Sequence, residues 1–238
     1  MAINIRRFNA ADATPGHEGT ILASDVLPDS MDAPFRHQYG YLAKQGLTMA
    51  GHAHPTDEIY IVLSGSGYVI VGGENREVFA GDTIAIPAGM WHTMLCTDKN
   101  TAPFLWAALW WDKIKQDAKL DDIARQNIHI QRFSKEKASP SHQGTILADR
   151  VLPACIKAPF EHAYGYMEDG NAMELHKHPT YEVYIVYSGE GFVTVGDEKC
   201  AAGPGDVIEI PPDTPHTMTA PEKGAFLWAA LWWNPVNE

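Results

Sequence analysis

The stretch of sequence that decides the fold occurs twice in the chain. Residues 46–65 read GLTMAGHAHPTDEIYIVLSG, and residues 170–189 read GNAMELHKHPTYEVYIVYSG. Each copy carries two histidines, a proline, a threonine and a glutamate before an apolar run that ends in serine and glycine. A period this long is not that of a solenoid repeat, so the sequence predicts two copies of one domain.

The similarity extends outward in both directions from this stretch. Residues Gly19–Ala23 return as Gly144–Ala148, and the segment FLWAALWW at Phe104–Trp111 returns unchanged at Phe226–Trp233. Between the copies, apolar residues follow the spacing of a short amphipathic helix. The predicted organisation is a first domain over residues 1–111, a linker helix over 112–127 and a second domain over 128–238.

The remaining apolar runs are short, rich in β-branched and aromatic residues, and bounded by glycines. Such runs are typical of strands, and strands at regular spacing indicate an all-β sandwich or barrel. The predicted strands are residues 59–63, 68–71 and 83–86 in the first half and 183–187, 192–195 and 207–210 in the second.

Composition excludes several function classes. The 238 residues include 18 Lys and Arg against 30 Asp and Glu, a formal net charge of −12 that disfavours nucleic acid and anionic lipid as partners. No apolar run reaches membrane-spanning length, and the first residues do not resemble a signal peptide. Three scattered cysteines without a C-x-x-C pair favour reduced thiols. We expect a cytoplasmic protein.

The histidines supply the strongest functional signal. The chain has 11, and all but His129 occupy equivalent positions in the two repeats. Solvated surface histidines would not be expected to pair so completely. The pairs are His17/His142, His37/His162, His52/His176, His54/His178 and His92/His216.

Four residues in each half form a predicted metal site. Histidines two apart in a strand point to the same face, so His52 and His54 would both point into the barrel. Imidazole and carboxylate ligands suit divalent iron, manganese, nickel, cobalt or zinc, and four protein ligands leave a position open, as in catalytic sites. Two alternatives are hydrogen-bonded core histidines and a purely structural metal. The predicted ligands are His52, His54, Glu58 and His92, then His176, His178, Glu182 and His216.

These residues carry a family resemblance. The pattern Gly46-x5-His52-x-His54-x3-Glu58-x6-Gly65 resembles the first signature of the cupin superfamily, and Gly81-x5-Pro87-x-Gly89-x2-His92 resembles the second. Residues 170–189 and 205–216 repeat both, so the chain is similar to the bicupins. The departures are Cys96 and Ala220 in place of an asparagine, and Asp213 in place of a glycine. The resemblance implies two tandem double-stranded β-helix (jelly-roll) barrels, each holding a metal inside.

Further residues are candidates for catalysis or substrate binding. A carboxylate ligand that detaches from the metal could act as a base, and tyrosines and histidines near the site could move protons. Each aromatic or histidine candidate has the alternative role of a packed, hydrogen-bonded core residue. The catalytic candidates are Glu58, Glu182, Tyr60, Tyr184, His37 and His162; the substrate-binding candidates are Tyr39, Tyr164, Trp106 and Trp228.

The resemblance implies a range of functions. Bicupins include oxalate-degrading enzymes, quercetin-type dioxygenases, sugar isomerases and storage proteins without the ligands; two complete ligand sets weigh against storage. The few basic residues disfavour oxalate or a sugar phosphate. The leading hypothesis is a dioxygenase for a small neutral or enol-type substrate, with two iron or manganese ions per chain; zinc, nickel and cobalt also fit. The alternatives are a sugar isomerase or lyase that uses the metal as a Lewis acid, and a non-catalytic ligand-binding or metal-binding cupin. The paired tryptophans are compatible with a homo-oligomer.

Overall fold

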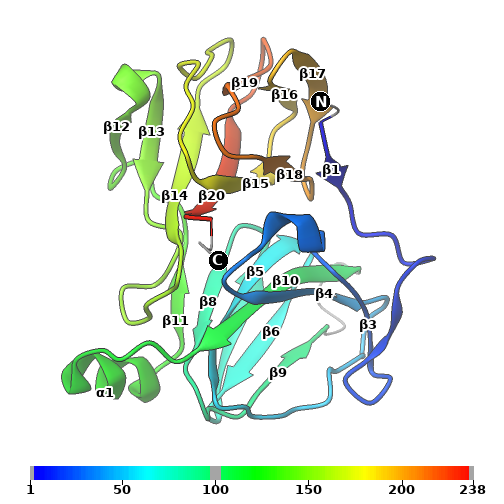
Figure 1. The fold of residues 1–238 in the computed structure, drawn as a ribbon. Helices are drawn as coiled ribbons and strands as arrows, with labels where there is room; N and C mark the ends of the chain where they lie inside the picture. Colours follow the sequence, from blue (N-terminus) through cyan, green and yellow to red (C-terminus); the bar gives the residue numbers. More distant parts are fainter. Residues whose placement is uncertain (1–2, 97–102, 236–238) are drawn as a thin grey trace.

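The computed structural model describes residues 3–96 and 103–235, and within them the chain forms two β-barrels (Figure 1). Each barrel consists of a seven-stranded sheet and a three-stranded sheet, with antiparallel pairing throughout. One short helix lies between them in the chain. The predicted all-β architecture of two tandem barrels is confirmed. Residues 1 and 238, the outermost bounds of the predicted domains, lie outside the described residues.

The first barrel has the strand orders β11-β8-β5-β10-β4-β3-β2 and β7-β6-β9. A 3-10 turn, η1 (Asp29–Met31), precedes β4. The strands are β2 (Thr14–Gly16), β3 (Ile21–Ser24), β4 (Arg36–Leu42), β5 (Thr56–Ser64), β6 (Ser66–Val71), β7 (Glu74–Phe79), β8 (Thr83–Ile86), β9 (His92–Leu95), β10 (Phe104–Asp112) and β11 (His129–Gln131).

The second barrel repeats this plan with the orders β1-β18-β15-β20-β14-β13-β12 and β17-β16-β19. A 3-10 turn, η2 (His142–Gly144), precedes β13. The strands are β1 (Ile5–Arg6), β12 (Ser139–Ser141), β13 (Ile146–Asp149), β14 (Glu161–Met167), β15 (Tyr181–Ser188), β16 (Gly191–Val195), β17 (Glu198–Ala202), β18 (Val207–Ile210), β19 (His216–Thr219) and β20 (Phe226–Trp233).

The linker contains the expected helix, α1 (Ala118–Gln126), which is shorter than predicted. Its first turn is capped by Asp117, whose side chain accepts a hydrogen bond from the backbone N–H of Lys119. Asp112 still belongs to β10, and Asn127 is extended, so neither end of the linker is helical. No helix among the described residues has the length and apolarity required to cross a bilayer.

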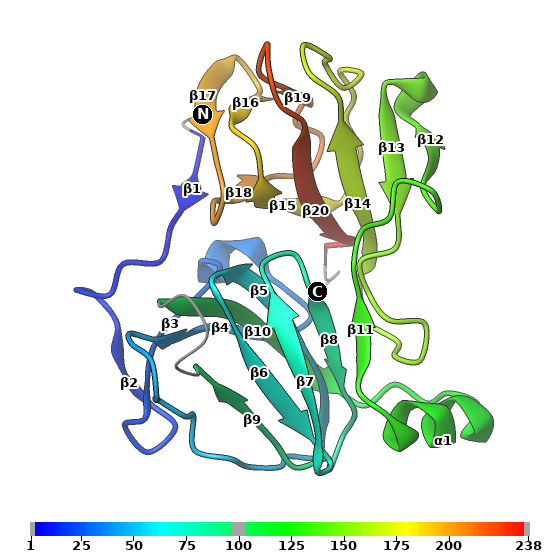
Figure 2. The ribbon, with the colours of Figure 1, turned by 180° about the vertical axis from the view of Figure 1, so that it is seen from behind.

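Each large sheet takes one strand from the other repeat. The N-terminal strand β1 pairs with β18 of the second barrel, whereas β11 pairs with β8 of the first (Figures 1 and 2). Arg7 follows β1 and forms an ion pair with Asp206; Arg132 follows β11 and forms the equivalent pair with Asp82. The sheets therefore cross the predicted boundary between the two domains in both directions.

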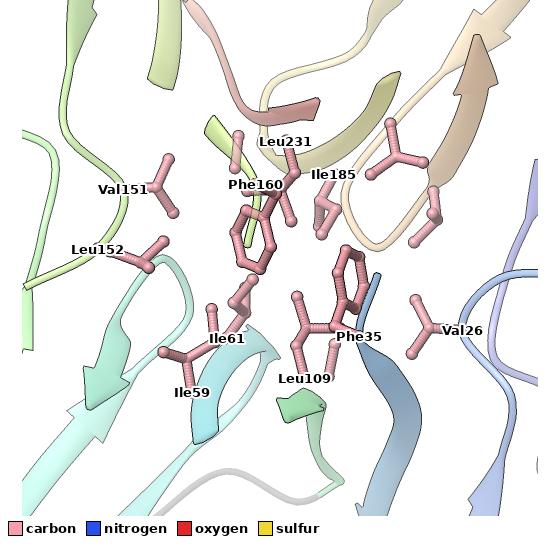
Figure 3. Packing of buried hydrophobic residues seen from close by; sticks show 14 of the residues in the cluster. Val26, Phe35, Ile59, Ile61, Leu109, Val151, Leu152, Phe160, Ile185 and Leu231 are labelled. Carbon is pink, nitrogen blue, oxygen red and sulfur yellow. The ribbon is translucent and has the colours of Figure 1, made fainter. Parts of the chain in front are cut away.

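The outer faces of the large sheets pack against each other and form a shared core (Figure 3). The ring centroids of Phe35 and Phe160, from opposite repeats, lie 4.9 Å apart. Trp111 lies 5.4 Å from Phe160, and Trp233 lies 5.3 Å from Phe35, so the contacts are reciprocal. Burying a Phe side chain contributes about 1.5–3 kcal/mol, so these contacts hold the barrels together.

This interface explains why β5 is apolar on both faces although its sheet is antiparallel. Tyr60 and Val62 point into the barrel core, whereas Ile59 and Ile61 belong to the shared core. A half-exposed strand would alternate polar and apolar residues. Because the second barrel covers the outer face of the sheet, both faces of β5, the strand that carries Glu58, are buried.

Candidate metal centres

The first donor set is brought together by three separate elements. His52 and His54 lie before β5, Glu58 lies in β5 of the large sheet, and His92 begins β9 of the small sheet. The ligand nitrogens of His52 and His54 both join the donor set, as predicted, but neither residue lies in a regular strand. His52 forms an isolated bridge with His92, through reciprocal backbone hydrogen bonds of 3.1 and 2.9 Å, and His54 lies outside any strand, before a bend at Pro55.

The second donor set forms a compact group. One ligand atom from each of His176, His178, Glu182 and His216 lies within 4.8 Å of the others. Oε2 of Glu182 is 3.0 Å from Nε2 of both His178 and His216. The four predicted ligands of this half therefore converge on one point.

The first donor set has nearly the same arrangement. The ligand nitrogens of His52, His54 and His92 lie within 4.8 Å of one another. Oε2 of Glu58 lies 3.0 Å from Nε2 of His54 and 3.1 Å from Nε2 of His92. The carboxylate thus reaches two of the three imidazoles, on the buried side of the group.

The outer nitrogen of most of these imidazoles is held by the backbone. Nδ1 lies 2.9 Å from Met90 O in His92, 2.9 Å from Thr214 O in His216 and 3.0 Å from Glu174 O in His176. A carbonyl oxygen only accepts, so each Nδ1 donates its proton. In the neutral ring this leaves Nε2 with a free lone pair that points into the donor set.

The donor atoms fit a cation. Nε2 of His92 and Nε2 of His216 are buried and have no hydrogen-bond partner, yet each lies 3.0–3.1 Å from a carboxylate oxygen. A lone pair held this close to a carboxylate oxygen is unfavourable unless something positive lies between them. A divalent transition metal satisfies both atoms at once, and nitrogen with carboxylate oxygen is a donor set that such ions accept.

The ionisation states also suit metal binding. Burial would raise the pKa of Glu58 and Glu182, but the adjacent histidine rings, foremost His54 and His178, outweigh burial and lower it. Both carboxylates are therefore ionised at neutral pH. Burial lowers the pKa of His52 to about 4, so its ring is neutral there. The Glu58 carboxylate raises the pKa of His54, so a proton and a metal ion compete for that nitrogen.

Each donor set opens into a cavity. The cavity of the first barrel, about 390 Å³, is lined at its mouth by Arg36, Gln38 and Asp112. That of the second, about 360 Å³, is more apolar, with Ile146, Ala148, Ala163, Met173 and Trp232 in its lining. The difference comes from the sequence, since Ala163 is the counterpart of Gln38 and Glu161 that of Arg36.

The two tyrosines predicted to be catalytic lie beside the donor sets. Tyr60 and Tyr184 are buried, and their rings lie 5.8 and 5.9 Å from those of His92 and His216. Burial first, and the neighbouring carboxylate second, raises both pKa values far above the ordinary value, so the hydroxyls remain protonated. Tyr184 lines the second cavity, whereas the hydroxyl of Tyr60 contacts Met49 Sδ at 4.0 Å.

The structure does not bring His37 or His162 to the donor sets. Residues alternate along β4, and because Gln38 faces the first cavity, His37 faces the shared core together with Phe35. Nδ1 of His37 accepts a hydrogen bond from the backbone N–H of Leu27 at 3.5 Å, and Nδ1 of His162 accepts one from Val151 at 3.3 Å. These contacts match the alternative role of a hydrogen-bonded core residue.

The four predicted substrate-binding residues lie mainly in the core. Tyr39 belongs to the shared core, and the hydroxyl of Tyr164 donates to Gly81 O of the other barrel at 3.1 Å, although Tyr164 also lines the second cavity. Trp106 and Trp228 fill the two barrels and are almost fully buried. Only Trp228 of these two lines a cavity.

Four aromatic residues outside the predicted site sets also line the two cavities. These are His17, His142, Trp110 and Trp232. The signal for the histidines was their pairing between repeats. The tryptophans were equally visible in the repeated segment, but the sequence does not indicate which tryptophan of that segment faces the cavity.

The match to known sequence families agrees with this geometry. The model of the cupin domain matches residues 40–108 and 164–233, which contain both donor sets. The chain is a cupin. This cupin is also 34% identical over 88 residues to an uncharacterized protein of Methanocaldococcus jannaschii, a match that covers 36% of this chain and 70% of that protein.

Solved structures show the same fold over nearly the whole of this cupin. A cupin 2 conserved barrel domain protein from Leptotrichia buccalis matches with a TM-score of 0.66 and 15% identity, covering 98% of both chains. Salicylate 1,2-dioxygenase from Pseudoaminobacter salicylatoxidans matches with a TM-score of 0.66 and 14% identity, covering 97% of this chain and 82% of that one. Oxalate decarboxylase from Lactobacillus farciminis matches with a TM-score of 0.61 and 16% identity, covering 100% of this chain and 88% of that one. Identities this low establish the fold alone.

Proposed function

We propose that this cupin is a metal-dependent dioxygenase that binds one iron or manganese ion in each barrel and acts on a small neutral or enol-type substrate. The observation that carries the proposal is the second donor set, in which three imidazoles and one carboxylate meet at the inner end of an apolar cavity. A structural metal is usually enclosed by its protein ligands, whereas this site opens towards a space of about 360 Å³.

The protein residues have distinct roles in this proposal. His176, His178, Glu182 and His216 hold the ion, which supplies a Lewis acid and a redox centre when bound. Glu182 accepts the proton that an enol-type substrate releases, because its carboxylate is ionised and lines the cavity. The protonated hydroxyl of Tyr184 lies in the same lining and donates to a substrate oxygen. The apolar wall excludes water.

The structural neighbours and the lining of the second cavity both support the proposal. Among the structural neighbours, one is titled a salicylate dioxygenase and another an oxalate decarboxylase. Among the described residues, the lining of the apolar second cavity contains no Arg or Lys, which favours a neutral or delocalised substrate over a small dicarboxylate. The proposal extends to the first barrel through its equivalent donors, His52, His54, Glu58 and His92.

The first cavity supports a second candidate function, a non-redox isomerase or lyase for a sugar-like molecule. Its mouth carries Arg36, Gln38 and Asp112, which are polar groups suited to hydroxyls. In this alternative a bound ion would supply a Lewis acid for the substrate carbonyl, and Glu58 would move the proton.

Oxygen uptake separates the candidates. The protein is loaded anaerobically with Fe(II) or Mn(II), and a panel of β-dicarbonyl, ortho-dihydroxyaromatic and ketose compounds is added in an oxygen-electrode chamber. The dioxygenase proposal expects substrate-dependent oxygen consumption that His178→Ala abolishes in the second barrel. Turnover of a ketose without oxygen consumption would support the isomerase instead. Tight binding without turnover of any compound would favour a ligand-binding cupin.

A further inference from the structure

Two histidines that the proposed mechanism does not use stand next to the metal donors. His17 lines the first cavity and His142 lines the second, at equivalent positions in the two repeats. The ring of His17 lies 4.5 Å from that of the ligand His52, and the ring of His142 lies 4.4 Å from that of the ligand His176. A histidine therefore borders each donor set from outside.

The backbone holds both histidines in an uncommon conformation. The φ angles are 47° at His17 and 59° at Glu18, and 50° at His142 and 55° at Gln143, all in the left-handed region. Residues with side chains adopt this region rarely, so its recurrence in both repeats indicates that the turn serves to place these side chains.

Each turn is tied to the segment that carries the metal ligands. The hydroxyl of Thr145 donates to His142 O at 2.7 Å and accepts from the backbone N–H of Glu174 at 3.0 Å. Thr20 makes the equivalent contacts with His17 O at 2.6 Å and the N–H of Ala50 at 2.8 Å. The position of each histidine relative to the donor set is thus fixed by two hydrogen bonds.

The protons of the second pair can be assigned from their partners. Nε2 of His142 lies 3.2 Å from Nε2 of His176. Since Nδ1 of His176 donates to Glu174 O at 3.0 Å, its Nε2 is unprotonated, and His142 must supply the proton between them. The hydroxyl of Ser141, 3.1 Å away, then donates to Nδ1 of His142. His142 therefore presents an N–H group to the site.

We propose that His142 is a substrate-binding residue whose Nε2–H donates a hydrogen bond to an anionic oxygen of the molecule that occupies the second cavity. His17 has the equivalent role in the first barrel. The inference rests on the proposed metal function: with the Nε2 lone pair of His176 given to a bound ion, the N–H of His142 would be free to donate towards the cavity. His142 is not itself one of the four donors that converge on one point. The substrate class narrows to enolates and other oxyanions.

The test uses cobalt and azide as probes in a chain with a single intact site. His54→Ala removes the first site, and the second is loaded with Co(II), whose visible absorption changes when azide binds. In this background His142→Gly removes the imidazole and tolerates the left-handed backbone. Gln143→Gly, in the same turn, is the matched control. His142→Gln restores an N–H donor.

Two measurements, the Co(II) content and the azide dissociation constant, decide the inference. We expect the Co(II) content to be the same in all variants and the azide dissociation constant to rise about 5- to 20-fold in His142→Gly, the loss of one hydrogen bond to a charged group. Gln143→Gly should not change it, and His142→Gln should recover part of the affinity. Unchanged azide affinity in His142→Gly overturns the inference, as does loss of Co(II), which would make His142 a metal ligand or a structural residue.

The two proposals fail in different ways. A background protein that takes up no Co(II) overturns the metal site and, with it, the role of His142. Normal Co(II) and azide binding combined with no oxygen consumption by the iron protein removes the dioxygenase chemistry and leaves the role of His142 supported.

Discussion

The guanidinium of Arg132, in the second repeat, pairs with the carboxylate of Asp82, a residue of the first barrel. Nη2 of Arg132 lies 2.7 Å from Oδ2 of Asp82, which is fully buried, whereas the Arg132 side chain is 58% exposed. Arg7 and Asp206 form the same contact in the other direction, with Nη2 and Oδ2 2.9 Å apart. Each of the two exchanged strands, β1 and β11, is thus followed by an arginine that forms an ion pair with an aspartate of the barrel that the strand joins.

Removing Arg132 should leave the buried carboxylate of Asp82 without its charged partner, although the backbone N–H of Phe79 still donates to it at 2.9 Å. We expect Arg132→Met to lower the free energy of unfolding by about 1–3 kcal/mol, the range for a hydrogen bond to a charged group; the partial exposure of the arginine keeps the effect below that for a fully buried pair. Urea denaturation measures it. Arg150→Met, at an exposed arginine, is the control. Equal stability of the two variants would show that the pair contributes nothing.

The donor sets should lose metal independently. Because the cavities and donor sets belong to different barrels, we expect about two metal ions per fully loaded wild-type chain and about one after His54→Ala or His178→Ala. Elemental analysis of the purified variants gives the counts, and the double variant should bind none. Two ions per chain in both single variants would remove the metal assignment.

Glycine is required where a tryptophan side chain packs over the neighbouring strand of the large sheet. A Cβ atom at Gly165 would lie 2.3 Å from Cε2 of Trp228, and one at Gly40 would lie 2.3 Å from Cε2 of Trp106. Gly165→Ala should therefore lower the free energy of unfolding by about 1–3 kcal/mol, as overpacking does, and alter the near-ultraviolet circular dichroism of the tryptophans. Gly203→Ala is the control, because its nearest neighbour is Glu190 Cγ at 3.9 Å. Similar stability of both variants would contradict the expectation.

His162 should make the fold sensitive to acid. Burial first, and Arg150 second, lowers the pKa of His162 to about 4. In the unfolded chain this histidine takes up a proton near pH 6.5, whereas in the folded chain it does so only near pH 4. Its contribution to the free energy of unfolding is therefore fully present above pH 6.5 and is lost as the pH falls towards 4. His162→Gln, which keeps a hydrogen-bond acceptor for the N–H of Val151, should remove up to roughly 3 kcal/mol of this loss. Unfolding free energies measured from pH 7 to pH 4 would contradict this if both proteins fell in parallel.

Much of the site was predictable because its residues are close in sequence or repeated. His176, His178 and Glu182 stand within one short segment, and the repeat supplied His216 as the equivalent of His92. The β class followed from glycine-bounded apolar runs. His52 and His54 reach the donor set without a regular strand, because a spacing of two puts side chains on one side of any extended segment, whether or not that segment pairs with a neighbour.

Other features depended on packing between distant segments. Local alternation places His37 and Gln38 on opposite faces of β4, but only the packing of the second barrel decides which face is the interface and which is the cavity. The strands β1 and β11 are too short for their sequences to specify a partner, and their place in the opposite sheet follows from the closed arrangement of both barrels.

The sequence by itself determined the duplication, the β class and the eight predicted donor residues, because these depend on repeated spacing and on the chemistry of side chains. Only the tertiary structure decided the exchange of β1 and β11 and the approach of His142 to His176. The reason is physical: a local pattern fixes the face of a strand on which a residue lies, whereas the contacts between faces are set by the packing of segments far apart in the chain.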